Sequence, residues 1–328
     1  MDKAKAIDIS GYSKVWVPRR RNISETPETG KMCLVLPVDV KTELSKAILI
    51  MRELALQAGQ TMKNYRKGKI EAALKLDGSV VTQVDKEIQK LIVDKLRKEF
   101  PDFKIIAEEV LEEQGYLESS KTVSGFTFVI DPIDGTRKFM DPQEKYFGCG
   151  IALMYDGEVI SAVFYAPEYE IHGYPNDKWS GSLFEASELS EEVILNEKRI
   201  SMEPERNNFV NDTVVLEDVG ENGLNLYGFK VIHETGSDLL TLSRISSGLD
   251  GTPVVLANGG WAGSGGAHLW DVVPGAYFIE KAGGIVCNRN GDPFFPLKDN
   301  LALHKNNLVY KGEYFAGYPN VIKQLLGR

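Results

Sequence analysis

Cysteine and histidine are scarce in this sequence. There are four histidines and three cysteines, and Cys33, Cys149 and Cys287 are widely spaced and form no Cys-x-x-Cys pattern. A disulfide framework or a thiolate zinc site needs paired or clustered cysteines, so the sequence argues against both. We interpret the cysteines as small apolar residues of a protein from a reducing compartment.

Long apolar runs are also missing. No stretch approaches the roughly 20 apolar residues that a membrane-spanning helix requires. The first thirty residues are polar and include the acids Asp2, Asp8, Glu25 and Glu28, which suit neither a secretory signal nor an organellar transit peptide. We therefore expect a cytoplasmic protein.

Positive charge is in deficit. The chain has 38 Lys and Arg against 47 Asp and Glu, a formal net charge of -9. Nucleic-acid binders usually present a basic face, and anionic membranes attract basic segments, so we expect neither kind of partner. A small anionic substrate stays possible, because bound cations can reverse the field inside an acidic cleft.

The chain is long enough for two lobes. Its 328 residues are 43% hydrophobic and 26% charged, which is ordinary for a globular protein. Prolines punctuate the start, which predicts an N-terminal arm over 1–37. We expect an N-terminal lobe over 38–175 and a C-terminal lobe over 176–328.

Helical and strand-like segments alternate along the chain. Apolar residues at helical spacing predict helices over 42–65, 86–100, 238–247 and 271–282. Short apolar, β-branched segments predict strands over 103–107, 126–130, 148–155, 158–165, 230–233 and 254–257. Asp156-Gly157 is typical of a hairpin turn, and the polar stretch 185–221 suggests a segment that connects two lobes or decorates one. The fold class is α/β with layered helices and sheets.

The motif Asp131-Pro132-Ile133-Asp134-Gly135-Thr136 directly follows one predicted strand. Two carboxylates this close repel each other unless a cation lies between them, and magnesium prefers oxygen ligands. The amides of Gly135 and Thr136 start a new turn, where a phosphate group can bind. Asp-Pro and Asp-Gly are also common loop dipeptides, so a plain turn is the alternative.

Further acids stand at the ends of predicted elements. Glu108-Glu109 follows a strand, Asp85 precedes a helix, and Asp271 begins one. Taken singly, each has an ordinary explanation, as a solvated loop for the glutamate pair and as a helix cap for the two aspartates. Together they suggest acids converging on one site.

The order of these segments resembles the inositol monophosphatase superfamily. The resemblance covers about residues 41–291 and depends on DPIDGT at 131–136 and WDVVPGA at 270–276. It implies that Asp85 and Thr136 lie beside the attacking water, and that Gly135 and Thr136 bind phosphate. Asp77 and Thr82 match less securely. The implied metal ligands are Glu108, Asp131, Asp134, Asp271 and the carbonyl of Ile133.

That resemblance implies a hydrolase with two or three Mg²⁺ ions, inhibited by lithium, that acts on a small phosphorylated metabolite. It also implies stacked layers of helix and sheet around one cleft, and family members are often homodimers.

Substrate choice depends on fewer residues. The family's usual inositol-binding glutamate is replaced here by Ser264, seven residues before Asp271 in a glycine-rich loop. Gly236-Ser237 resembles the turn beside the substrate, and His268 occupies a position where the family often has histidine, although a packing role explains it too.

Several functions stay open at this point. An inositol-phosphate-type phosphatase is the first interpretation, and a 3′(2′),5′-bisphosphate nucleotidase is the second. A histidinol-phosphate or sugar-bisphosphate phosphatase is a further alternative. The non-enzymatic alternative is a catalytically silent regulator that binds a phosphorylated metabolite, although such proteins should have lost some of the acids that this chain retains.

Overall fold

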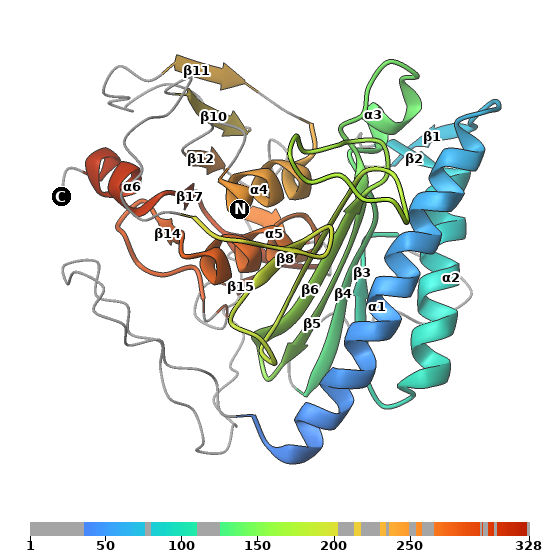
Figure 1. The fold of residues 1–328 in the computed structure, drawn as a ribbon, viewed down its shortest axis with the longest axis horizontal. Coiled ribbons are helices and arrows are strands. Elements are labelled where there is room, and N and C mark those ends of the chain that lie inside the picture. Colours follow the sequence, from blue (N-terminus) through green and yellow to red (C-terminus); the bar gives the residue numbers. More distant parts are fainter. Residues whose placement is uncertain are drawn as a thin grey trace.

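The computed structural model describes most of the chain, and everything below refers to that part (Figure 1). The described residues are 36–75, 80–109, 125–202, 213–217, 230–233, 236–248, 254–257, 266–295, 297, 301–304 and 307–326. Nearly all of the predicted N-terminal arm lies outside them.

Helices and strands alternate, as the α/β prediction required. The helices are α1 (Val38–Tyr65), α2 (Gln83–Glu99), α3 (Thr136–Met140), α4 (Asp238–Ser247), α5 (Leu269–Ala282) and α6 (Pro319–Leu325). The strands of the first half are β1 (Ala72–Leu74), β2 (Val80–Thr82), β3 (Lys104–Ala107), β4 (Phe126–Asp134), β5 (Gly148–Tyr155), β6 (Glu158–Ala166), β7 (Ser182–Ser187), β8 (Val193–Leu195) and β9 (Lys198–Ile200). Those of the second half are β10 (Thr213–Glu217), β11 (Lys230–His233), β12 (Val254–Ala257), β13 (Gly266–His268), β14 (Ile285–Asn288), β15 (Leu301–His304), β16 (Asn307–Lys311) and β17 (Tyr314–Gly317).

Two large sheets organise the molecule. Seven strands pair in chain order from β3 to β9, with only the β3–β4 pair parallel. Five strands form the second sheet in the order β11-β10-β12-β17-β14. Smaller sheets join β1 with β2, and β13 with β16 and β15.

Helices cover both faces of the seven-stranded sheet. The pair α1 and α2 packs on one face, while α4 and α5 lie between this sheet and the five-stranded one (Figure 1). Side chains of β4 therefore alternate between two cores: Phe128 and Ile130 pack with α1 and α2, and Val129 packs with α5. Because both faces are buried, the first part of the strand, 126–130, is mostly apolar.

The predicted starts of α1, α2 and α5 were too late, and for α2 the reason is local. Thr82 caps α2 in a capping box, in which its side chain accepts from the Asp85 amide while the Asp85 side chain accepts from the Thr82 amide. Asp85 is therefore the third residue of the helix and not its cap. In α5, which starts at Leu269, Asp271 likewise lies within the first turn.

The stretch 185–221, interpreted as connecting two lobes or decorating one, contains strands that the sequence did not predict. β7 overlaps its start, β8 and β9 follow and extend the seven-stranded sheet, and β10 begins the second sheet. These strands are short or polar on one side, which hides their pattern from a periodicity reading. The Asp156-Gly157 hairpin is confirmed, and both residues have positive φ, 48° and 84°.

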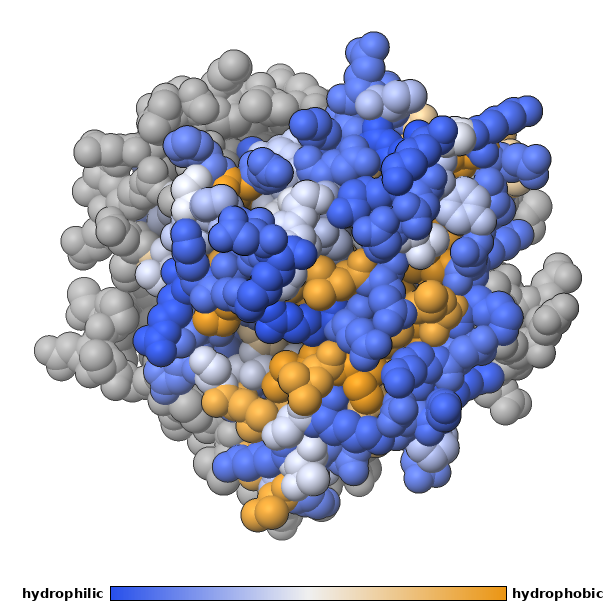
Figure 2. Space-filling model, turned by 45° about the vertical axis from the view of Figure 1, so that its right-hand side comes forward, coloured by the Kyte–Doolittle hydropathy of each residue, from blue (hydrophilic) through white to orange (hydrophobic). Residues whose placement is uncertain are grey.

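Hydrophilic side chains dominate the face seen in Figure 2, and apolar ones reach the surface there in smaller groups. The large apolar side chains that are most exposed include Val38 and Leu49 on α1 and Leu74 on β1. Among the described helices, none is long and apolar enough to cross a membrane.

Gly59 of α1 allows a close approach to Tyr165 of the seven-stranded sheet. A Cβ there would lie 2.3 Å from Cε1 of Tyr165, a buried β6 side chain. Gly59→Ala is therefore expected to lower the free energy of unfolding by about 1–3 kcal/mol through overpacking, although alanine favours a helix by about 1 kcal/mol. Urea unfolding measures this, with Gly68→Ala as the matched control, because the nearest atom to a Cβ at Gly68 is 3.7 Å away. Equal midpoints for both variants would contradict the packing.

Candidate active site

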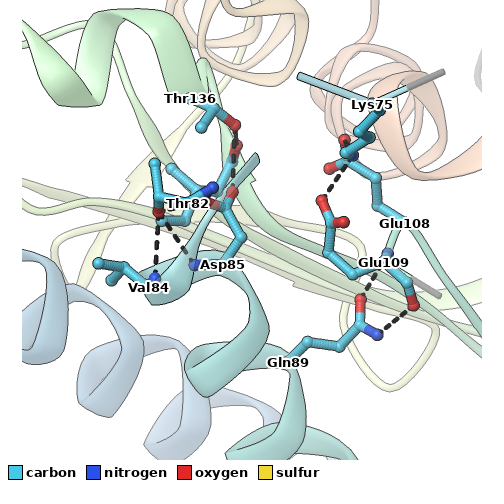
Figure 3. Close-up of polar contacts among 9 residues, drawn as sticks. Lys75, Thr82, Val84, Asp85, Gln89, Glu108, Glu109 and Thr136 are labelled. Atoms are coloured by element: carbon cyan, nitrogen blue, oxygen red, sulfur yellow. Dashed lines mark hydrogen bonds and ion pairs between the residues drawn. The ribbon is translucent and has the colours of Figure 1, made fainter. Parts of the chain in front are cut away.

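Asp85 is the centre of a buried hydrogen-bond cluster (Figure 3). Its Oδ2 accepts from the Thr82 amide at 2.8 Å and from the Thr82 hydroxyl at 2.5 Å. Its Oδ1 lies 3.1 Å from the Thr136 hydroxyl, which is also 3.0 Å from the carbonyl oxygen of Ile133. The capping box of α2 therefore orients the carboxylate that contacts Thr136.

The electrostatics of Asp85 are set mainly by its burial. Burial raises the pKa of this carboxyl to about 6, the charge of Glu108 raises it further, and the hydrogen bonds from Thr82 and Thr136 oppose the rise. At neutral pH Asp85 is thus an ionised acceptor for the Thr136 hydroxyl proton.

The end of β4 presents the two aspartates of the DPIDGT motif. Asp131 pairs with Gly150 and Asp134 with Gly148, and the register shifts between them where Pro132 interrupts the ladder. Gly135 follows with a φ of 80°, which favours glycine, and begins α3. The irregularity lets both carboxylates and the start of α3 come from one short segment.

Asp131 is unusual among the buried acids. It is 2% exposed, and within the described part of the chain its Oδ1 has no hydrogen-bond donor. Burial raises its pKa well above the ordinary value, and the charges of Glu108, Asp134 and Asp271 add to the rise. Ionising a buried carboxylate is costly in free energy unless a cation lies beside it.

Asp271 shares this environment from a different helix. Burial raises the pKa of Asp271 well above the ordinary value, and the charges of Glu108 and Asp134 raise it further. These mutual effects mean that the four predicted metal-ligand acids, drawn from β4, α5 and the end of β3, lie within electrostatic reach of one another.

Lys75 sits against the glutamate pair that follows β3. Its ammonium lies 2.7 Å from Oε1 of Glu108 and 2.6 Å from Oε1 of Glu109 (Figure 3). Burial alone would lower the pKa of Lys75, but the two carboxylates outweigh it and raise that pKa. Burial, with the Glu108 charge, raises the pKa of Glu109 to about 8 despite Lys75.

Gln89 of α2 fixes the backbone of this glutamate pair. Its side-chain amide donates to the Glu109 carbonyl at 2.6 Å and accepts from the Glu109 amide at 2.8 Å (Figure 3). Glu108 in turn donates its amide to the Ile130 carbonyl at 3.2 Å. The loop after β3 is therefore tied to both α2 and β4.

Of the predicted substrate-side residues, one contacts a predicted metal ligand, one packs on an aromatic ring, and one lies outside the described residues. Ser237 donates a hydrogen bond to Oδ2 of Asp134, and Gly236 before it has a φ of 75°. The ring of His268 stacks on Trp270, with centroids 4.5 Å apart, which is a packing contact. Ser264 and Asp77 lie outside the described residues.

Sequence reasoning missed Lys75 and Gln89. A lysine after a short exposed strand and a glutamine on a helix carry no local signal, because their contacts are made 33 and 20 residues away in the chain.

The donor set suits a hard divalent cation. Carboxylates and a carbonyl are the oxygen ligands that magnesium prefers, and among the described residues none donates to Oδ1 of Asp131. Within the described ranges, no three His, Cys, Asp or Glu side chains are grouped in metal-holding geometry.

Curated proteins of similar sequence cover most of the chain. A Nus factor SuhB from Pasteurella multocida is 26% identical over 279 residues, which cover 84% of this chain and 92% of that protein. A fructose-1,6-bisphosphatase/inositol-1-monophosphatase from Thermotoga maritima is 27% identical over 256 residues, covering 75% of this chain and 84% of its own length.

Solved structures share the fold. An inositol monophosphatase from Anabaena has a TM-score of 0.62 at 21% identity, covering 87% of this chain and 95% of that one. Neighbours of this fold include SaIMPase-II with inositol monophosphate bound and an IMPase/NADP phosphatase complexed with NADP and Ca²⁺. At 16% and 17% identity, with TM-scores of 0.58 and 0.60, these two likewise show the fold alone. The model of the inositol monophosphatase family matches residues 43–316, and this chain belongs to that family.

Proposed function

We propose that this protein is a magnesium-dependent phosphatase that hydrolyses a phosphate monoester of a small metabolite, with inositol-phosphate-type activity as the first candidate. The observation that supports this most is the Asp85–Thr136 contact beside a buried cluster of acids. Family membership and relatives named for phosphatase activity agree with it.

Magnesium would be held by Glu108, Asp131, Asp134, Asp271 and the Ile133 carbonyl. Bound there, it would polarise the phosphate and lower the pKa of a coordinated water. The ions would also replace the role of Lys75 in neutralising Glu108. We also propose that the enzyme is inhibited by lithium, forms a homodimer and is cytoplasmic.

The chain's own groups would orient the attack. Thr136 donates its hydroxyl proton to Asp85, so its oxygen lone pairs can accept a hydrogen bond from the attacking water. The amides of Gly135 and Thr136 at the start of α3 would bind phosphate oxygens, where charge accumulates in the transition state. No nucleophilic side chain is needed.

Substrate identity follows from a phosphate-release panel. The full-length chain is assayed with inositol 1-phosphate, adenosine 3′,5′-bisphosphate, fructose 1,6-bisphosphate and histidinol phosphate, with Mg²⁺ and with EDTA. We expect release that requires Mg²⁺ and falls when Li⁺ is added. Fastest release from the bisphosphate nucleotide would replace the inositol-phosphate assignment with the second candidate.

A silent outcome has its own meaning. Some relatives are named Nus factor SuhB and not phosphatase, so a non-enzymatic role is the alternative. If no substrate releases phosphate while the protein still binds Mg²⁺, the phosphatase proposal is wrong, and a regulator that binds a phosphorylated metabolite becomes the better account.

A further inference from the structure

The turn before α4 makes an unusual use of its serine. Ser237 occupies the N-cap position, where a serine side chain normally accepts from the helix's own amides. Its hydroxyl makes no such bond and instead donates to Oδ2 of Asp134, a residue of the other half of the chain. The usual cap has been replaced by a long-range contact.

Asp134 takes over the capping role. The same Oδ2 accepts from the backbone amide of Leu240 at 3.2 Å, which is the third residue of α4. A carboxylate at this position satisfies an amide that would otherwise lack an intrahelical acceptor, and it meets the positive end of the helix dipole. One oxygen of Asp134 therefore receives two donors from the first turn of α4.

Two glycines make the approach possible. A Cβ on Gly135 would lie 3.1 Å from the Gly236 carbonyl oxygen and 3.2 Å from Cβ of Ser237. Both glycines have positive φ, 80° and 75°. The turn that starts α3 and the turn that starts α4 are thus in direct contact, which brings Ser237 within reach of Asp134.

We propose that Ser237 and the first turn of α4 are the positioning element for Asp134, fixing its Oδ2 so that the carboxylate is presented to a divalent cation in one orientation. This inference rests on the proposed function. A carboxylate held by two donors loses little side-chain freedom when the ion binds.

Direct metal titration tests this without any substrate. Isothermal titration calorimetry of the full-length chain with Mg²⁺ compares the parent with Ser237→Ala and Ser237→Thr. We expect Ser237→Ala to weaken Mg²⁺ binding by about 10-fold or more, within the range for residues that orient metal ligands. Ser237→Thr keeps the hydroxyl and should stay within threefold of the parent.

Ser246→Ala is the matched control. This buried serine lies on the same helix, and its hydroxyl donates to the Ser243 carbonyl at 2.7 Å, away from Asp134. It should reproduce any loss of stability caused by deleting a buried hydroxyl, with unchanged Mg²⁺ affinity. If Ser237→Ala does not fold by circular dichroism, Ser237→Gly replaces it, because glycine is accepted at an N-cap.

The outcomes separate this inference from the proposed function. A folded Ser237→Ala protein with parental Mg²⁺ affinity overturns the positioning role and leaves the phosphatase proposal standing. If Ser237→Ala binds Mg²⁺ more weakly than the parent, and the parent releases phosphate from no substrate, the positioning role stands and the phosphatase proposal is overturned. A parent protein that binds no Mg²⁺ overturns both.

Discussion

Asp134→Asn is expected to give a folded protein whose phosphate release is reduced by roughly 10²–10³-fold or more, as when a group that stabilises the charged transition state is removed. Asparagine still offers an oxygen to Ser237 and to the Leu240 amide, so the start of α4 should persist. What disappears is one negative charge from the acid cluster. Steady-state kinetics with saturating Mg²⁺ and the best substrate from the panel measure the loss.

The stability of this variant gives a second readout. Asp134 raises the pKa of both Asp131 and Asp271, so its charge repels theirs in the metal-free protein. Asp134→Asn should therefore be at least as stable as the parent in EDTA, yet gain less stability when Mg²⁺ is added. Asp177→Asn, at an exposed position, is the control and should match the parent throughout. Full activity of Asp134→Asn would discard the metal assignment.

Thr136→Val is expected to lower the turnover number by about 10²–10⁴-fold, the usual effect of losing a positioned proton-transfer group. Valine has nearly the shape of threonine but leaves Asp85 Oδ1 without the 3.1 Å contact from the hydroxyl. The metal ligands remain, so Mg²⁺ affinity by calorimetry should change only a few-fold.

Thr136→Ser is the matched variant, because it keeps the hydroxyl and removes only a methyl group. It should retain most of the activity lost in Thr136→Val. If Thr136→Val instead weakened Mg²⁺ binding as much as turnover, Thr136 would belong to the metal site rather than to the group that orients water.

Much of the local structure could be predicted from the sequence. The apolar run before Asp131 predicted a strand, and β4 has that strand, although it continues to Asp134. The predicted α4 has the expected bounds, and the Asp156-Gly157 turn joins β5 and β6 as its residues require. These features are set by residues close to one another in the chain, and hydrophobic periodicity and turn residues are therefore enough to predict them.

Other predictions failed for want of long-range information. The strands β7, β8 and β9 were not predicted, because short strands with polar residues acquire their order from the sheet they join. The role of Asp85 was ambiguous for a related reason. An aspartate that supports a helix start and one that contacts a distant side chain have the same sequence appearance. Here Asp85 does both, as the third residue of the α2 capping box and as a partner of Thr136.

The sequence by itself determined which groups this protein has for chemistry: acids at element ends, the DPIDGT turn, and an excess of acidic over basic side chains. Only the tertiary structure decided how those groups are held. Lys75 faces the glutamate pair, Gln89 fixes its backbone, and Ser237 reaches Asp134 across 103 residues. Hydrogen bonds and ion pairs act over a few ångströms of space, and separation along the chain does not reveal which residues folding brings that close.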